Sequence, residues 1–508
     1  MTRTLLITGC RVHTPGGPAG AMAVADTVLW TGEVAEGRER FPGAVELSLD
    51  GATVTPAFVD SHVHATSAGL LLTGIDLKGC GSLAEFLDAV RRFAVSGEAP
   101  LLWGQGWDET RWPERRPPTR AELDEATGGR PAYLSRVDMH SALVTSQLAA
   151  RATGEAGFHP DGPLSQQAHH VVRQAALDTL ADAQRDAAQG AFLAHAAAHG
   201  IAAVHECAGP DISGVADLRA LLDRAAAGGT PDVVGYWGQP VGDAGQATEL
   251  LAATGASGLA GDLFCDGAVG SRTASLCAPY ADAAHTTGAA YLDAAAIAAH
   301  VAACTEVGTQ AGFHVIGDAA MAAVVEGVRL AGERLGKATV AACTHRLEHV
   351  EMITQEQARV LAAHGVMGSV QPLFDALWGG PDGMYAERLG AERAIAMNPF
   401  SMLAATGVAL TFGSDVPVTP VGPWAAVRAA VRHRTPGSGL TPVDALRAHT
   451  AHGHLAARAG GVGELVAGQA ATYAVWDGDG LDLDAPVPRC VATVVRGRAI
   501  HDDEGLLR

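Results

Sequence analysis

Short apolar runs alternate with longer alanine-rich segments through most of this chain. Between about residues 56 and 461, runs of strand length end in Gly, Asp or His, and helical candidates such as "AAAIAAHVAACTEVG" and "AAMAAVVEGVRLAGERLG" follow them. Repeated strand–helix units are typical of a parallel sheet covered by helices. The pattern therefore predicts an α/β protein whose main domain, 56–461, is a (β/α)8 TIM-like barrel. A doubly wound open sheet is the alternative.

The two ends of the chain have a different pattern. Short strand-like segments separated by Gly and Pro fill residues 1–55, and the segments "QAATYAVWDGD" and "CVATVVRGRAIHDD" lie within 462–508. Chain termini often lie close together in a folded protein, so we expect both ends to form one small composite β-sandwich domain. A further change of pattern at about 75–170 predicts an insertion over the barrel mouth.

Composition narrows the class of protein. The 508 residues include 35 Lys and Arg against 55 Asp and Glu, a formal net charge of −20. Nucleic-acid binding needs a basic stripe, and a membrane helix needs roughly 18 consecutive apolar residues, so neither partner is expected. The 8 cysteines include no CxxC pair, and the first apolar run is too short for a signal peptide. We expect a cytoplasmic enzyme that acts on a small molecule.

Histidines and a carboxylate stand at the ends of several predicted strands. Taken alone, a His-x-His pair is a weak metal signal, a single histidine is more often structural, and an Asp often caps a turn. In a barrel, however, the carboxyl ends of all strands meet at one mouth, so together they predict a zinc-type site with positions left for water. The residues are His62 and His64 in "VDSHVH", His314 in "GFHVIGD", His349 in "RLEHVE" and Asp415 in "FGSDVPV".

These motifs, with "CDGAVGSRTASLCAPY" and "GWDETRW", resemble the amidohydrolase superfamily and its amidohydrolase family 3 branch, which includes N-substituted formamide deformylases. The resemblance runs over essentially the whole chain. It implies a metal-bearing barrel with a terminal β-sandwich, in which metal-activated water hydrolyses a C–N or related bond. One or two divalent ions, zinc first among them, would be held by His62, His64, His314, His349 and Asp415. Asp415 would also be the catalytic acid and base, and His349 would help to polarise the substrate.

One position departs from the family pattern. Many relatives have a lysine at the start of the "DG" strand, which bridges two metals when carboxylated, whereas this chain has Asp262 in "GDLFCDG". Strand alternation places Asp262 on the same face as Asp266, so a carboxylate can still point inward. Glu206 in "AVHEC" is a second candidate for the bridge. For both, a structural carboxylate paired with Arg or Lys is the alternative, and the number of metals stays open.

Further polar residues are expected to support the ligands or to hold a substrate. Asp60 shares the strand face of His62, and His345 stands four residues before His349, so both, with Asp266, are candidates for orienting ligands. His345 could also orient the substrate, and packing is the alternative for it. A small-molecule pocket needs an apolar wall and a polar anchor, although the aromatic rings could instead pack the insertion against the barrel. The candidates for the pocket are Trp107, Asp108, Arg136, His140, Arg272 and Trp378.

The leading interpretation is a metal-dependent amidohydrolase that cleaves an amide, formamide, carbamate or N-acyl bond of a small apolar or aromatic compound. A deaminase of a heterocyclic amidine on the same scaffold is the alternative. A non-catalytic scaffold protein is disfavoured, because the whole set of histidines and Asp415 is present. The resemblance also leaves a homodimer as one alternative for the oligomeric state.

Overall fold

The computed structural model describes residues 4–96, 99–136, 141–210, 212–503 and 505–507. The chain forms two compact units. One comprises Met1–His64 together with Leu193–Arg508, and the other comprises Ala65–Phe192. The first unit contains a barrel and a β-sandwich, and the second has its own sheet and core. Among the described residues, no helix is both long and apolar enough to cross a membrane.

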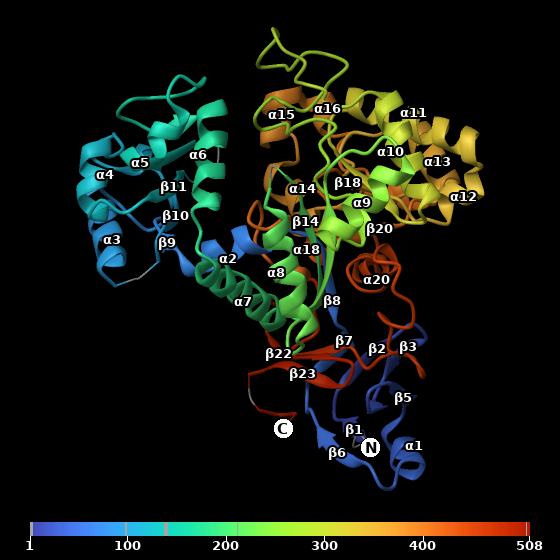
Figure 1. The fold of residues 1–508 in the computed structure, drawn as a ribbon. Helices are drawn as coiled ribbons and strands as arrows, with labels where there is room; N and C mark the ends of the chain where they lie inside the picture. Colours follow the sequence, from blue (N-terminus) through green and yellow to red (C-terminus); the bar gives the residue numbers. More distant parts are fainter. Residues whose placement is uncertain (1–3, 97–98, 137–140, 211, 504, 508) are drawn as a thin grey trace. The chain divides into compact units, whose positions relative to one another are not determined.

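An eight-stranded parallel sheet forms the centre of the first unit (Figure 1). The strand order is β20-β19-β18-β17-β16-β15-β14-β8. The strands are short, apolar and mostly buried, as expected for parallel strands that helices cover. They are β8 (Phe58–Val63), β14 (Ile201–Ala208), β15 (Asp232–Trp237), β16 (Gly258–Leu259), β17 (Gln310–Val315), β18 (Arg346–His349), β19 (Met367–Val370) and β20 (Leu410–Phe412).

The sheet closes where its last strand meets its first. Val416, just beyond β20, forms a parallel bridge with Val63 of β8, and the Asp415 amide donates to the His62 carbonyl at 2.8 Å. Gly413 permits this close approach, because an added Cβ would lie only 2.6 Å from the Cβ of His62. The predicted (β/α)8 barrel is therefore confirmed, and the open doubly wound sheet is wrong.

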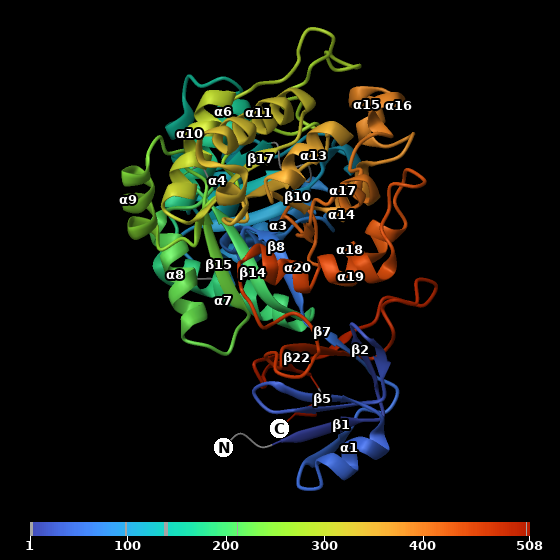
Figure 2. The same ribbon diagram turned by 90° about the vertical axis from the view of Figure 1, so that its right-hand side faces the viewer.

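Helices connect successive strands and cover the outside of the barrel (Figure 2). Several begin at residues whose side chains accept a hydrogen bond from the first turn, among them Asp243, Asp293 and Thr354, which stabilises the helix start. The helices after β14 are α8 (Val215–Ala226), α9 (Ala244–Thr254), α10 (Ala294–Glu306), α11 (Asp318–Leu335), α12 (Lys337–Ala341), α13 (Gln355–Ala363), α14 (Pro372–Trp378), α15 (Met384–Leu389), α16 (Ala391–Ala394), α17 (Phe400–Thr406), α18 (Pro423–Val431), α19 (Pro442–Ala448) and α20 (Ala451–Ala456).

Strands from both ends of the chain pair in one sandwich. One sheet has the order β23-β22-β21-β7-β2-β3 and the other β5-β4-β1-β6. Ile7 and Met22 of the second sheet share a buried cluster with Val54 and Tyr473 of the first, so the two sheets enclose a common apolar core. The elements are β1 (Leu5–Thr8), β2 (Arg11–Thr14), β3 (Gly17–Ala19), β4 (Ala21–Val24), β5 (Val28–Gly32), α1 (Val34–Arg40), β6 (Val45–Ser48), β7 (Thr53–Pro56), β21 (Tyr473–Trp476), β22 (Cys490–Val495) and β23 (Arg498–Asp502).

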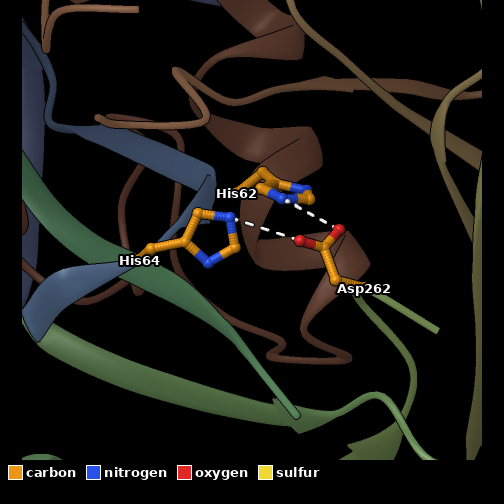
Figure 3. A group of neighbouring side chains, drawn as sticks. All are labelled: His62, His64 and Asp262. Carbon is orange, nitrogen blue, oxygen red and sulfur yellow. Dashed lines mark ion pairs between the residues drawn. The ribbon is translucent and has the colours of Figure 1, made fainter. Parts of the chain in front are cut away.

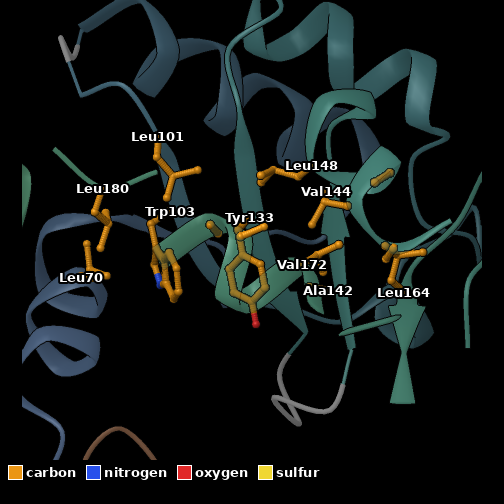
Figure 4. Packing of buried hydrophobic residues seen from close by; sticks show 14 of the residues in the cluster. Leu70, Leu101, Trp103, Tyr133, Ala142, Val144, Leu148, Leu164, Val172 and Leu180 are labelled. Atoms are coloured by element: carbon orange, nitrogen blue, oxygen red, sulfur yellow. The ribbon is translucent and has the colours of Figure 1, made fainter. Parts of the chain in front are cut away.

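The unit Ala65–Phe192 lies in the chain between β8 and β14, and so begins earlier and ends later than the insertion of about 75–170 marked by the sequence. Its sheet has the order β13-β12-β11-β10-β9. In the apolar cluster of Figure 4 the rings of Trp103 and Tyr133 lie 4.5 Å apart. The elements are α2 (Ala65–Thr73), β9 (Ile75–Asp76), α3 (Leu83–Ser96), β10 (Leu102–Trp107), η1 (Glu109–Arg111), α4 (Arg120–Thr127), β11 (Ala132–Arg136), β12 (Ser141–Val144), α5 (Ser146–Ala149), η2 (Ala150–Ala152), β13 (Leu164–Ser165), α6 (Gln166–Asp178) and the start of α7 (Asp182–Ala198).

Substitution of Gly413 tests barrel closure. We expect Gly413→Ala to lower the free energy of unfolding by about 1–3 kcal/mol, since the new methyl group must push β20 away from β8. The matched control is Gly460→Ala, at a position where an added Cβ meets no atom within 4 Å. Thermal unfolding of the two variants measures the difference. An equal midpoint for both would contradict the account of closure.

Candidate metal centre

Six polar side chains converge at the carboxyl ends of the barrel strands. β8 contributes two of them, and β16, β17, β18 and β20 contribute one each, in the strand itself or just after it. Because all of these strands are parallel, their carboxyl ends lie at the same mouth of the barrel. The six side chains are at most 8% exposed: His62, His64, Asp262, His314, His349 and Asp415.

The carboxylate of Asp262 faces the rings of His62 and His64 (Figure 3). Its Oδ1 is 3.4 Å from Nε2 of His62 and 3.6 Å from Nδ1 of His314, and its Oδ2 is 3.3 Å from Nε2 of His64. Two sets of potential metal ligands therefore overlap here, each with its ligand atoms within 4.8 Å of one another. One set is His62, His64 and Asp262, and the other is Asp262, His314 and His349.

Asp415 completes the cluster from the closing strand. Its Oδ1 lies 3.2 Å from Nε2 of His64 and 3.5 Å from Nε2 of His62. It also forms a potential ligand set with His62 and His349. The site thus combines four imidazoles with two carboxylates.

Two of the histidines are oriented by acceptors on their outer side. His62 Nδ1 donates to Glu348 Oε2 at 2.9 Å, and His349 Nδ1 donates to Gln371 Oε1 at 2.8 Å. A carboxylate and an amide oxygen can only accept, so the proton of each neutral ring lies on Nδ1. In the neutral form, both rings would therefore present an unprotonated Nε2 to the cluster, which is the form that binds a metal.

Five buried polar atoms of the cluster have no hydrogen-bond partner among the described residues. One is Nδ1 of His64, and the other four are Nε2 of His62, Nε2 of His349, Nδ1 of His314 and Oδ1 of Asp262. A buried acceptor without a partner is energetically unfavourable. The last four of these atoms converge, and because acceptors cannot bond one another, a cation is the partner that would satisfy them. Imidazole nitrogen and carboxylate oxygen are ligands that zinc and similar divalent ions accept. The residues therefore fit the metal that the motifs imply.

The charges of the cluster also favour a cation. Burial lowers the pKa of His64, but its hydrogen bonds with Asp262 and Asp415 and their charges raise that pKa to about 9. Burial raises the pKa of Asp262, but the charge of His62 and the close polar contacts with the surrounding histidines bring it well below its ordinary value. The two carboxylates thus stabilise positive charge on the imidazoles. With a divalent ion bound, the ion would supply the positive charge and the rings would be neutral.

The family profile of the amidohydrolases matches residues 46–501 of the chain. The chain belongs to the amidohydrolase family. A Bacillus subtilis (strain 168) protein named amidohydrolase YtcJ is 25% identical, over 95% of this chain and 96% of its own length. An N-substituted formamide deformylase of Arthrobacter pascens is 24% identical, over 87% and 86%. A solved structure of an uncharacterized metal-dependent hydrolase from Pyrococcus furiosus has a TM-score of 0.79 at 24% identity, and the match covers 94% of this chain and 100% of that one.

These comparisons confirm the resemblance drawn from the motifs, and membership of the amidohydrolase family makes this protein a hydrolase. The solved structure shares its fold.

The backbone of this amidohydrolase leaves the strand conformation at two cluster residues. His349 has φ 73° and Asp415 has φ 55°, the left-handed region that residues with a Cβ rarely adopt. At β18 this matters for side-chain direction, because Arg346 and Glu348 face the barrel interior and the next residue would otherwise face outward. The left-handed turn at His349 brings its ring to the mouth.

The strand pleat also explains why His345 does not orient a ligand. It lies on the outer face, where its Nε2 pairs with the hydroxyl of Thr305 at 2.9 Å and its Nδ1 accepts from the Ala311 amide at 2.8 Å. Regular alternation along the strand would place His345 and His349 on the same face, and the left-handed turn at His349 breaks that alternation. The residue that does orient a cluster histidine is Glu348, and alternation from Arg346 in "RLEHVE" is the signal that could have identified it.

Glu206 does not join the cluster. It lies in the middle of β14, where the neighbours on either side face inward: His205 contacts Arg346, and Cys207 belongs to a possible ligand set with His62. Alternation then turns Glu206 away from the barrel interior. Burial raises the pKa of the Cys207 thiol to about 12, so the thiol is a poor ligand beside the imidazoles. Of the two candidate bridging carboxylates, the structure brings only Asp262 to the histidines.

Asp60 and Asp266 support the site through the backbone. Asp60 Oδ1 accepts from the Ser414 amide at 2.8 Å, next to Asp415. Asp266 accepts from the amides of Ser275, Ile316 and Gly317 at 2.7–3.0 Å, and so holds the turn that follows His314. Asp60 Oδ1 also accepts from the His62 amide at 3.4 Å, so Asp60 supports a ligand as expected, whereas Asp266 binds the amides of adjoining loops.

Aromatic rings line part of the cluster. The ring of Phe374 is nearly parallel to that of His349, with centroids 5.9 Å apart, and Trp378 lies 4.7 Å from Phe374 on the same helix, α14. Phe264 lies 4.8 Å from His314. Trp378, a predicted pocket residue, is thus separated from the cluster by the ring of Phe374. Phe374 and Phe264, which the sequence analysis did not single out, lie against the cluster histidines.

The other predicted pocket residues have partners of their own. Arg272 pairs with the Asp282 carboxylate at 2.5 Å. Within the unit Ala65–Phe192, Arg136 pairs with Asp108 at 3.0 Å and lies 5.8 Å from the ring of Trp107. That ring is fully buried in the core of its unit, so it packs there and does not line an open pocket. His140 lies outside the described residues.

The two candidate bridging carboxylates make a matched pair for metal analysis. We expect Asp262→Asn to lower the metal-to-protein ratio of the purified protein, because the amide removes the charge that both ligand sets share. Glu206→Gln should leave the ratio unchanged. Elemental analysis after dialysis against metal-free buffer gives both values. A lower ratio in Glu206→Gln, with an unchanged ratio in Asp262→Asn, would reverse the assignment.

Proposed function

We propose that this amidohydrolase cleaves a C–N bond of a small, neutral, apolar or aromatic compound: an amide, formamide, carbamate or N-acyl compound. One observation carries the proposal. Four buried atoms without hydrogen-bond partners point at one place among His62, His349, His314 and Asp262, with the carboxylate of Asp415 beside them. This is the arrangement that a hydrolytic metal centre needs.

The ligand sets support a centre for two zinc ions that share Asp262. His62 and His64 would hold one ion, and His314 and His349 would hold the other. When bound, divalent ions in such a site lower the pKa of water and polarise the oxygen of the scissile carbonyl. The protein contributes the orientation of the rings through Glu348 and Gln371, together with the exclusion of bulk water by burial.

Asp415 is the proposed acid and base. Its carboxylate takes a proton from the attacking water and returns that proton to the leaving nitrogen. Burial raises the pKa of Asp415, but the charge of His62 and the hydrogen bond with His64 lower it overall, so the group starts the reaction as a carboxylate. The hydrogen bond from its backbone amide to the His62 carbonyl, at 2.8 Å, holds it against the cluster.

The rings beside the cluster support an apolar or aromatic substrate. Phe374, Trp378 and Phe264 form an apolar border close to His349 and His314, and flat rings of this kind favour stacking partners. The Arthrobacter pascens relative is named for N-substituted formamides, which have a C–N bond of the proposed type. We include formamides among the first compounds to assay for this reason.

The unit Ala65–Phe192 is proposed to contribute to substrate binding. It follows directly after His64, in the first strand–helix connection at the carboxyl end of β8, and barrel enzymes build their sites from these connections. Asp108, Arg136 and His140 remain the proposed polar contacts from this unit.

Asp415→Asn tests the acid–base role. We expect kcat to fall by about 10²–10⁴-fold, with the fold retained, because the amide keeps the shape of the side chain but cannot take up a proton. Asp282→Asn, at the ion pair with Arg272, serves as the control and should keep wild-type kcat. Amine and acid products are measured on a panel of formamides, amides and carbamates. Wild-type turnover by Asp415→Asn would assign the proton transfer to another group, and ammonia release from heterocycles alone would favour the deaminase.

Trp378→Ala tests the aromatic border. We expect KM for aromatic amides to rise about tenfold, equivalent to about 1.4 kcal/mol, and KM for small aliphatic amides to change little. Leu377→Ala is the matched control, because its side chain is on the same helix and 56% exposed. Steady-state kinetics with the two substrate types measures the difference. An equal change in KM for both types would argue against ring stacking.

A further inference from the structure

A fully buried arginine crosses the interior of the barrel. Arg346, at the start of β18, has no exposed surface. Its guanidinium lies 4.4 Å from the ring of Tyr236 on β15 and donates to the Ser61 carbonyl on β8 at 2.6 Å. It also donates to the Ser369 hydroxyl on β19 at 3.0 Å and to Nδ1 of His205 on β14 at 3.0 Å. One side chain therefore connects strands on opposite sides of the barrel.

The same guanidinium clamps the carboxylate that orients His62. Arg346 Nε donates to Glu348 Oε1 at 2.6 Å, and its Nη2 donates to Oε2 at 2.9 Å. This two-pronged geometry is the strongest form of Arg–carboxylate pairing. Oε2 of Glu348 then accepts the Nδ1 proton of His62 at 2.9 Å. A continuous chain of contacts thus runs from the barrel interior to the metal cluster.

The pairing of Glu348 with Arg346 decides which nitrogen of a neutral His62 ring is protonated. Both oxygens of Glu348 accept from the guanidinium, Oε1 from Nε at 2.6 Å and Oε2 from Nη2 at 2.9 Å, and this pairing holds the group as a carboxylate. An ionised carboxylate accepts and cannot donate, so His62 must keep its proton on Nδ1. Its Nε2, which lies 3.4 Å from Asp262, is thereby kept free.

The barrel also leaves room for this pair. Gly312, on the neighbouring strand β17, faces the arginine, and a Cβ there would lie 2.9 Å from Cγ of Arg346 and 2.7 Å from Cβ of Ala260. Stability alone is a weak reason to bury an ion pair, because apolar side chains of similar volume often stabilise a core as well or better. The contact with His62 gives the pair a specific role.

We propose that Arg346 and Glu348 are positioning residues for the metal centre: Arg346 fixes Glu348 across the barrel, and Glu348 fixes the tautomer and the orientation of His62. Neither residue touches the substrate. The inference rests on the proposed function, because it requires His62 to be a metal ligand.

Glu348→Gln is the primary test, with Zn²⁺ alone as the probe. The amide must place either its oxygen or its NH2 group toward His62. If the amide oxygen faces His62, the NH2 group lies against the guanidinium of Arg346, donor against donor. If the NH2 group faces His62, it favours the tautomer whose proton is on Nε2. We expect Zn²⁺ affinity, measured by competition with a chelator, to fall about 10–100-fold. The visible spectrum of the Co²⁺-loaded protein, which reports the ligand geometry, should change as well.

A double variant and a control keep the test independent of folding. Arg346→Met combined with Glu348→Gln removes both charges, so no buried arginine is left without its partner, and we expect it to fold and still to bind Zn²⁺ weakly. Thr305→Val deletes the buried hydrogen bond to His345 on the outside of the same barrel region. It should lower the midpoint of thermal unfolding and leave Zn²⁺ affinity at the wild-type value.

The outcomes separate this inference from the proposed function. Wild-type protein that binds no Zn²⁺ would overturn the metal centre and the positioning role together. Wild-type protein that binds Zn²⁺, with folded Glu348→Gln and double variants that bind it equally well and give the wild-type Co²⁺ spectrum, would overturn the positioning role alone. Weaker binding in these variants, but not in Thr305→Val, is the result expected.

Discussion

Closure of the parallel barrel between β8 and β20 is the constraint on which the rest of this protein depends. His62 and Asp415 are far apart in the sequence, and they meet only because the last strand returns to the first, with the Asp415 amide bonded to the His62 carbonyl at 2.8 Å. Gly413 makes that approach possible. Once the sheet is closed, the parallel direction of all of its strands brings their carboxyl ends, and the side chains there, to one mouth.

Buried charge in the barrel is arranged in two connected levels. In the interior, Arg346 and Glu348 satisfy each other and reach strands on both sides. At the mouth, Asp262 and Asp415 face imidazoles, and the inward nitrogens of His62, His314 and His349 have no hydrogen-bond partner among the described residues. The charges of the interior pair balance each other, whereas the cluster at the mouth is suited to a cation, because charged groups in a water-poor site must be paired or coordinate a metal. His62 belongs to both levels.

Backbone conformation is least regular where the chemistry is placed. His349 and Asp415 have left-handed φ angles of 73° and 55°, which cost on the order of 1–3 kcal/mol each. The carboxylates of Asp60 and Asp266 bind the amides of the adjoining loops and offset part of that cost. The turn at His349 directs its ring into the mouth, where an ideal strand pleat would turn it outward, so the strain there has a structural purpose.

The sequence alone predicted the barrel and the convergence of the strand-end histidines with Asp415, because apolar periodicity and strand-end position are local properties of the chain. The family followed from the resemblance of its motifs. The tertiary structure decided what depends on contacts across the barrel or on departures from regular alternation. It placed Asp262 among the histidines and turned Glu206 away, and it moved the orienting role from His345 to Glu348, since the left-handed turn at His349 breaks the pleat. It also buried Trp107 in its own unit. Such contacts join residues that no local pattern relates, so only the folded chain reveals them.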